Sequence, residues 1–275
     1  MTIVVVLAIV TAVATAVRST WSPCGLSMLS TVTPLAEAGR GRRWSATARW
    51  FVAGAVVGGL SLGALMAALA ALVGALGPST ATVLAVATVA ALVGAASDLD
   101  PFGLHIPFHG RQVNERWLDQ YRAWVYGGGF GWQIGCGLAT YITTAGVYLT
   151  ILLVALTGSP LFALALGAAF GLVRGLAIYT GRSITSTERL LEVHRRFGAL
   201  RQPVRLATIA VMLVVGIVAA IGWAGVGGAV GASAAAAVIV GVSSLSHRGA
   251  SASTSSSTAT APTTTAPPVP AGGLG

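Results

Sequence analysis

The chain has 275 residues, of which 55% are hydrophobic and only 8% charged, and its mean hydropathy is +0.83. So few charges exclude a soluble globular domain, because the surface of such a domain has to be solvated. The formal net charge of +9 comes from arginine alone, since the sequence contains no lysine. These arginines lie beside apolar runs, so they indicate membrane topology rather than a nucleic-acid partner.

Several apolar runs are about 20 residues long, the length that a helix needs to cross a bilayer core of roughly 30 Å. Short segments of alternating polarity, which are typical of membrane barrels, are not found. The sequence therefore predicts an all-α fold: a polytopic membrane helix bundle of six to seven spans.

The first apolar run begins at Thr2, is followed by Arg18, and continues past Pro23 and Cys24 to about Glu37. It is too long for one straight span, which predicts a tilted or broken helix. No basic residue precedes the run, which argues against a signal peptide, and the positive charge behind it favours an N-terminus outside the cell.

Four further spans are expected at about 51–76, 80–97, 129–156 and 160–180. The loops after spans one, three and five carry four, three and six arginines, and the turns after spans two and four carry none. An arginine-rich loop typically stays on the cytoplasmic side. We therefore expect a multi-pass protein of the cell membrane with its arginine-rich loops in the cytoplasm.

The apolar stretch from 206 to 246 would be roughly 60 Å long as one helix, which is twice the thickness of the bilayer core. We therefore divide it near Gly225 into two spans. The Ser/Thr/Pro/Ala-rich tail over 247–275 is predicted to be disordered, because it has too little apolar surface to bury.

An internal repeat relates the two halves of the chain. Cys24-Gly25-Leu26 recurs as Cys136-Gly137-Leu138, 112 residues later, and glycines in the following spans match at nearly the same offset. Three spans separate the copies, so the copies are expected to have opposite orientations in the membrane. The predicted domain is then 1–246, with repeat one over about 1–97, an interfacial segment over 98–126 and repeat two over about 127–225.

Each cysteine lies beside residues that interrupt a helix. Freed backbone groups in a membrane are tolerated only where protein or a water-filled cavity covers them. We therefore expect each repeat to contribute a kink that lines a polar pocket. The predicted kink and pocket residues are Pro23, Gly25, Ser27, Gly135, Gly137 and Thr140.

On Ser22-Pro23-Cys24 and on the stretch from Gly131-Trp132 to Cys136-Gly137, the chain resembles the CcdA/DsbD transmembrane family of cytochrome c biogenesis. Members of that family are thiol–disulfide electron carriers. The resemblance implies that Cys24 and Cys136 form a catalytic redox pair and that Pro23 shapes the kink. It also implies a cytoplasmic thioredoxin-like donor and an extracytoplasmic thiol–disulfide acceptor as partners. Where the family carries further prolines this chain has Ser27, Gly135 and Ala139.

Arg174 lies within the predicted fifth span, and an intramembrane arginine usually faces the interior of the bundle or a cavity. Together with Arg18 it would stabilise a thiolate near the cysteines. The alternative is that Arg174 extends toward the cytoplasmic end of its span. The alternative for Cys24 and Cys136 is that they are two small residues that pack helices.

Two other patterns were weighed. The aromatic residues of 111–124 recur at helical spacing, which favours an amphipathic helix at the membrane interface. His105 and His109 have the spacing of metal ligands, but Pro107 lies between them, so a metal site is not favoured. No motif for a cofactor is present.

Three hypotheses for function follow. The first is a CcdA/DsbD-like carrier of reducing equivalents, which would make the protein a thiol–disulfide oxidoreductase. The second is a small-solute or ion transporter on the same inverted repeat, with Arg174 selecting an anion. The third is a membrane subunit that serves only as a scaffold for a partner.

Overall fold

The computed structural model describes residues 2–99, 121–140 and 142–257, with side chains described through Ser244. Within these ranges the chain is helical, without a β-strand, which confirms the predicted all-α class. The helices are α1 (Thr2–Arg18), η1 (Ser19–Trp21), α2 (Pro23–Thr31), α3 (Pro34–Gly39), α4 (Trp44–Leu76), α5 (Thr80–Leu99), α7 (Ala123–Cys136), α8 (Gly146–Leu156), α9 (Pro160–Leu176), η2 (Ala177–Gly181) and α10 (Thr187–Ser257).

Three of these helices begin at a hydroxyl residue followed by proline. Ser22, Thr33 and Ser159 are the N-caps of α2, α3 and α9, and each side chain accepts a hydrogen bond from a backbone N–H in the first turn. The following proline fits the first helical position, where its missing N–H costs nothing. A Ser/Thr-Pro pair therefore marks where a new helix begins within a chain that is apolar throughout.

Five helices among the described residues are long and apolar enough to cross a membrane: Thr2–Trp21, Trp44–Leu76, Thr80–Leu99, Pro160–Gly181 and Thr187–Ser244. Large apolar side chains cover their outer surfaces, including Val13 on α1, Leu72 on α4 and Val89 on α5. Apolar surface of this extent is stable in contact with lipid and not with water. The molecule is therefore a helical membrane protein.

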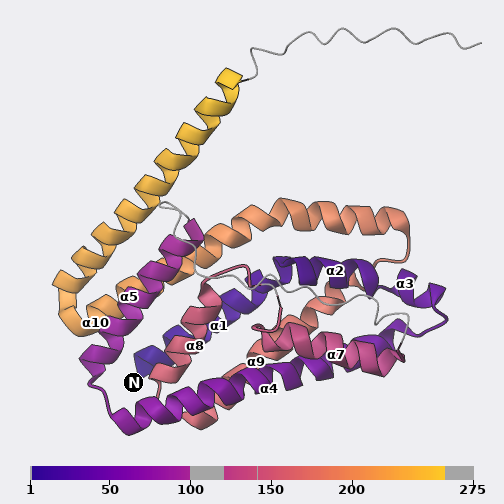
Figure 1. The fold of residues 1–275 in the computed structure, drawn as a ribbon, viewed down its shortest axis with the longest axis horizontal. Helices are drawn as coiled ribbons and strands as arrows, with labels where there is room; N and C mark the ends of the chain where they lie inside the picture. Colours follow the sequence, from indigo (N-terminus) through magenta and orange to yellow (C-terminus); the bar gives the residue numbers. More distant parts are fainter. Residues whose placement is uncertain (1, 100–120, 141, 258–275) are drawn as a thin grey trace, which may run out of the picture.

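Helix α4 runs along the lower edge of the molecule in Figure 1 and packs on both α7 and α9. A Cβ atom at Gly59 would collide with the backbone of Gly167 and Gly171, and one at Gly54 would collide with Gly128. These contacts show that the helices meet backbone to backbone, the arrangement that small residues permit in membranes.

The contacts also give the relative directions of the helices. Along α4 and α9 the contacting positions run in opposite order, from Ala55 with Gly171 to Gly59 with Gly167, so these helices are antiparallel. Along α4 and α7 they run in the same order, so these two are parallel. Spans that alternate in direction along the chain produce this arrangement. The antiparallel packing of α4 on α9 is also what an inverted repeat requires of its matched second spans.

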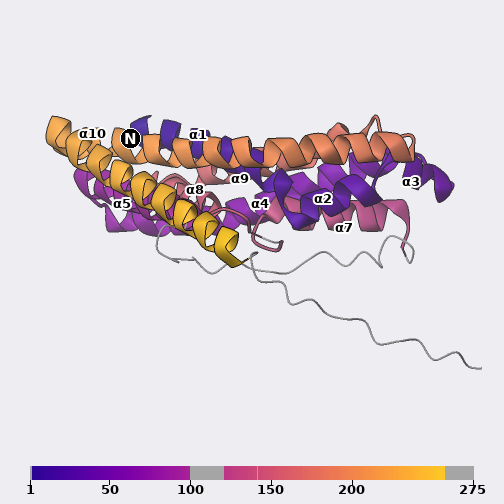
Figure 2. The same ribbon diagram turned by 90° about the horizontal axis from the view of Figure 1, so that it is seen from above.

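The remaining helices pack beside this central layer. Helix α5 packs along α10, and Gly94 lies against Met212 there. Helix α1 packs on α8, where the buried hydroxyls of Thr15 and Thr150 form a hydrogen bond of 3.0 Å. In the view turned by 90°, α10 runs along one side of the molecule for most of its length (Figure 2).

Helix α10 bends sharply at Gly225, where φ is 59° and ψ is −145°. Only glycine adopts this region of backbone space readily. The second arm, yellow in Figure 1, turns back and passes the end of α5, where the Ser243 hydroxyl donates to the Leu99 carbonyl oxygen. The division predicted near Gly225 is therefore present. The helix continues to Ser257, and 258–275 lie outside the described residues.

The kink expected beside Cys136 is a complete interruption, because the fourth span, expected over 129–156, is divided there into α7 and α8. One expectation about the spans was wrong. The arginine-rich stretch after the fifth span is not a loop, because α10 begins at Thr187 and continues without interruption past Arg205. Glu192 forms ion pairs with Arg195 and Arg196 there, and such pairs stabilise an exposed helix. Most of the predicted interfacial segment, 100–120, lies outside the described residues.

Candidate functional site

The first break in a span lies between α1 and α2. Helix α1 ends at Arg18, a single 3-10 turn follows, and Ser22 then starts α2 with Pro23 as its first residue. A Cβ atom at Gly25 would collide with the carbonyl oxygen of Thr20. Glycine at this position therefore allows the new helix to start directly against the end of the old one.

The second break lies between α7 and α8. Helix α7 ends at Cys136, and Gly137 then adopts a φ of +72°, which favours glycine. Helix α8 starts at Gly146, and Asp98 of α5 accepts hydrogen bonds from the Thr144 hydroxyl and from the backbone N–H of Ala145. A carboxylate at this position satisfies the free N–H groups at a helix start and complements the helix dipole.

Both cysteines lie at these breaks. Cys24 is in the first turn of α2 and is buried, and Cys136 is the last residue of α7 and is partly buried. Neither forms a disulfide. The side chain of Arg174, on α9, interacts electrostatically with both cysteines. Two residues 112 positions apart in the sequence are thus brought to the same cation.

Arg174 is only 3% exposed, so it does not extend toward the end of its span. Its guanidinium lies over the ring of Phe170, with 5.7 Å between the guanidinium carbon and the ring centroid. A Cβ atom at Gly137 would lie 3.0 Å from Nη1 of Arg174. The second break and the arginine are therefore in direct contact. A cation enclosed in this way is stabilised by π-electron density and by neighbouring sulfur rather than by water.

The other predicted kink and pocket residues lie at the same two breaks. Gly135 packs against the backbone of Ala55 on α4, which fixes the end of α7. Thr140 is fully buried between α7 and α8, and its hydroxyl has no hydrogen-bond partner. The carbonyl oxygen of Ser27 accepts a hydrogen bond from the Thr31 hydroxyl within α2.

Sequence reasoning missed a buried carboxylate. Glu37 is 0% exposed and accepts hydrogen bonds from Arg40, from the Thr47 hydroxyl at 2.6 Å and from the Tyr126 hydroxyl. The guanidinium of Arg42 lies 5.4 Å from the centroid of the Tyr126 ring. This network joins α3, α4 and α7. An acidic residue at the end of an otherwise apolar run was the only signal for it in the sequence.

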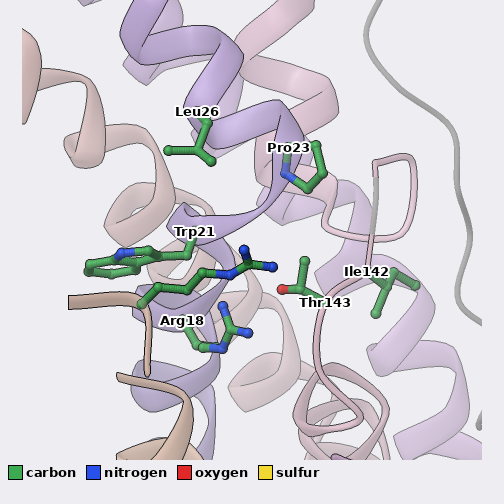
Figure 3. Close-up of a pocket in the computed structure, with 7 residues that line it drawn as sticks. Arg18, Trp21, Pro23, Leu26, Ile142 and Thr143 are labelled. Atoms are coloured by element: carbon green, nitrogen blue, oxygen red, sulfur yellow. The ribbon is translucent and has the colours of Figure 1, made fainter. Parts of the chain in front are cut away.

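Sequence reasoning also missed a basic cavity at the first break. A cavity of about 390 Å³ is lined by Arg18, Trp21, Pro23, Leu26, Ile142, Thr143 and Arg201 (Figure 3). A second, adjoining cavity is lined by Arg18, Gly198, Arg201, Gln202 and Arg205. The Trp21 ring stacks on Phe197 and its indole N–H donates to the Phe197 carbonyl oxygen, which fixes α10 against the break.

The histidine pair considered as a metal site, His105 and His109, lies outside the described residues. Within the described part of the chain no three His, Cys, Asp or Glu side chains gather as a metal site would require. Asp98, a carboxylate seven residues before His105 in the sequence, caps α8. His194 hydrogen-bonds to Ser30 and so joins α10 to α2.

Fold and site together define a helical integral membrane protein with two broken spans, each of which carries one cysteine. Proteins named methylamine utilization protein MauF are similar to this chain. The protein from Paracoccus versutus is 34% identical over 164 residues, which is 58% of this chain and 59% of that protein. The one from Paracoccus denitrificans is 33% identical over 171 residues, which is 61% of this chain and 60% of that protein.

A third relative, MauF of Methylophilus methylotrophus, is 31% identical over 165 residues, 58% of this chain and 56% of that protein. The match thus spans about 60% of the length of these relatives. No family model and no solved structure matches the chain. The resemblance to the CcdA/DsbD family therefore rests on the residues around the two cysteines and is not supported by these comparisons.

Proposed function

We propose that the protein carries reducing equivalents across the membrane by thiol–disulfide exchange between Cys24 and Cys136. The observation that supports this proposal best is that Arg174 interacts with both cysteines. A positive charge near both cysteines fits a redox pair, because exchange requires a thiolate and positive charge stabilises it.

The proposed reaction has two balanced steps. In the first, a dithiol donor reduces the Cys24–Cys136 disulfide: one donor thiolate attacks one protein sulfur, which forms a mixed disulfide and releases the other cysteine as a thiol. The second donor thiolate then attacks the donor sulfur of the mixed disulfide and releases the second protein thiol. The donor leaves as a disulfide. In the second step the two protein thiols reduce the disulfide of an acceptor by the same exchange, and the pair returns to the oxidised state. Each step transfers two electrons and two protons.

The two helix breaks supply what these steps need from the structure. Backbone that is not helical is tolerated in a membrane only beside protein or a water-filled cavity, and each cysteine lies at such a place. The donor would be thioredoxin-like and cytoplasmic, on the side of the arginine-rich segments, and the acceptor would be on the opposite side.

The names of the relatives place those proteins in methylamine utilization. We propose that this chain serves the same process in an accessory role, by controlling the thiol–disulfide state of a partner protein outside the membrane. Similarity over about 60% of the relatives supports this assignment, and so does the membrane-spanning fold.

The test is thiol trapping in intact cells with a mass-adding maleimide, with and without prior reduction. We expect the number of tags to rise by two after reduction in the wild type, and not to rise in Cys24→Ser or in Cys136→Ser. Two thiols that are always free, in cells deprived of reducing power as well, would overturn the proposal.

The alternative function is transport of a small anion, which the enclosed guanidinium of Arg174 beside two helix breaks favours. The two functions make opposite predictions. A carrier loses activity in Cys24→Ser and slows about tenfold in Arg174→Met, whereas Arg174→Lys retains much of the rate because the charge remains. A transporter tolerates Cys24→Ser and is inactivated by Arg174→Met. Maleimide reaction rates of the reduced protein and growth on methylamine are the two readouts.

A further inference from the structure

The basic cavity between the first helix break and the first arm of α10 has the features of an anion site. We propose that it binds a phosphate group, held by Arg18 and Arg201. This inference does not rest on the proposed redox function, because neither cysteine lines the cavity.

Arg18 forms the floor of the cavity. It is only 7% exposed, and its Nη1 atom is enclosed and has no hydrogen-bond partner. Arg18 lines the cavity beside Trp21 and Thr143 (Figure 3). Burying an unpaired cation is costly, and native structures usually supply a partner for it. A ligand that carries negative charge would be that partner.

The described residues around the cavity do not neutralise this charge. The charge of Arg18 is attracted by the carboxylate of Asp98 and repelled by the guanidiniums of Arg201 and Arg205. The carboxylate of Asp98 already accepts hydrogen bonds at the start of α8. Arg205 donates a hydrogen bond of 2.7 Å to the backbone carbonyl oxygen of Asp98 and not to its carboxylate. Three guanidiniums, of Arg18, Arg201 and Arg205, thus lie near one carboxylate that is already engaged, which leaves the cavity positively charged.

Other groups fit a phosphate in particular. The buried hydroxyl of Thr143 also has no hydrogen-bond partner, and Thr143 lines the cavity. Guanidinium groups match the geometry of phosphate oxygens and bind two of them at once. The apolar side chains of Trp21, Leu26 and Ile142 line the same cavity, whose volume of about 390 Å³ leaves room for the part of a molecule that carries the phosphate.

A phosphate group has two sources at a membrane: the free ion and the headgroup of a phospholipid. Basic pockets between spans bind headgroups by these same contacts. Arg201 is exposed and Arg18 is enclosed, so the cavity opens at α10 and ends at α1. A ligand from either source would enter past Arg201.

The experiment uses the full chain purified in a neutral detergent. Binding of inorganic phosphate is measured by calorimetric titration, with chloride as the control salt. Native mass spectrometry compares how much phosphatidylglycerol and how much phosphatidylcholine the protein retains. We expect saturable binding of one phosphate group per chain. Arg201→Met should weaken it by about tenfold or more, since each charge-assisted hydrogen bond contributes at least that factor. Retention of phosphatidylglycerol alone would assign the site to a lipid, and binding of inorganic phosphate would assign it to the free ion.

Arg189→Met is the matched control, because Arg189 is exposed on the same helix and lines neither cavity. Arg18→Met adds a second signature. It should abolish the rise in melting temperature that the ligand produces, and it should not lower the melting temperature without ligand. Thiol trapping of Cys24 and Cys136 should stay unchanged in Arg201→Met, which separates this site from the redox proposal. Absence of binding, or equal weakening by Arg201→Met and Arg189→Met, would overturn the inference.

Discussion

Buried charged side chains distinguish this chain at the scale of single residues. Glu37, Arg18 and Arg174 are each less than a tenth exposed, and each is treated differently by its surroundings. Glu37 accepts hydrogen bonds from three side chains, Arg174 lies over an aromatic ring and near the two cysteines, and Arg18 has an enclosed nitrogen without a partner. The first arrangement is typical of a structural group, and the other two are typical of groups that act on something else.

Glu37→Gln should therefore destabilise the protein strongly. Replacing the carboxylate removes a charged acceptor from Arg40, Thr47 and Tyr126, which should cost about 2–4 kcal/mol of unfolding free energy. Tyr126→Phe removes one donor and should cost about 1 kcal/mol. Thermal unfolding in detergent, followed by circular dichroism, measures both effects.

Glu192→Gln is the control for this prediction. Glu192 also forms ion pairs with two arginines, but it lies on the surface of α10, where such pairs are screened by water. We expect the melting temperature of the Glu192→Gln variant to equal that of the wild type. If Glu37→Gln lowered the unfolding free energy less than Tyr126→Phe, the carboxylate would not organise the network.

At the scale of helices, the close approach of α4 to its two neighbours determines the architecture. Gly54 and Gly59 allow α7 and α9 to contact the α4 backbone directly. Because lipid is as apolar as the helix surfaces, no hydrophobic effect drives these helices together, and van der Waals contact takes its place. Any side chain at such a position forces the helices apart.

Gly171→Ala should therefore lower stability by about 1–3 kcal/mol, the usual cost of adding atoms to a filled interface. A Cβ at this position would collide with the carbonyl oxygen of Ala55. Gly128→Ala is the control, because a Cβ there meets nothing within 4 Å. It should be neutral or slightly stabilising. Melting temperatures in detergent compare the two variants, and equal losses in both would contradict backbone contact between α4 and α9.

The helix boundaries could be predicted from the sequence where a local residue pattern marks them. Ser22-Pro23 and Gly225 carry local signals, a cap with a proline and a glycine in an apolar run, and both breaks were predicted. The break at Gly137 was expected from the glycines beside Cys136, but the length of the interruption was not, because the stretch lies within one continuous apolar run. The helix in the arginine-rich segment was missed because its many charges were taken to indicate a loop. The four-residue spacing of Glu192 and Arg196, which suits an ion pair on a helix, indicated otherwise.

The site was predicted less completely than the helices. The involvement of Cys24, Cys136 and Arg174 was expected from residue type and from a resemblance, and the structure brings all three together. The cavity partners Arg18 and Arg201 are 183 positions apart and belong to α1 and α10. No local pattern links them, because their contact depends on how α10 packs against the first break.

At the scale of the whole molecule, the directions of the helices make the topology testable. Helices α4 and α7 are parallel and α4 and α9 are antiparallel, as expected of spans that alternate in direction. We propose, from the arginine-rich segments, that these segments lie in the cytoplasm and that the N-terminus lies outside.

In a chain without its native cysteines, Ser45→Cys and Arg189→Cys should react with an impermeant maleimide only after the cells are opened. Ser79→Cys should react in intact cells, because it follows the far end of α4. All three positions are exposed, so access depends on the side of the membrane and not on burial. The reverse pattern would invert the topology, and a mixed pattern would contradict the alternation of spans.

The glycine contacts of α4 also have a mechanical consequence. Helices α4, α7 and α9 approach one another main chain to main chain at their glycines, so we expect these three helices to move as one body. Cys136 and Arg174 belong to that body. Cys24 lies on the separate nine-residue α2, whose buried side chains pack on α4 and α7 but whose main chain lies nearest the short turns η1 and η2. Opening and closing of the sulfur pair would therefore be a displacement of α2 against a stationary frame, with the residues between Arg18 and Pro23 as its hinge.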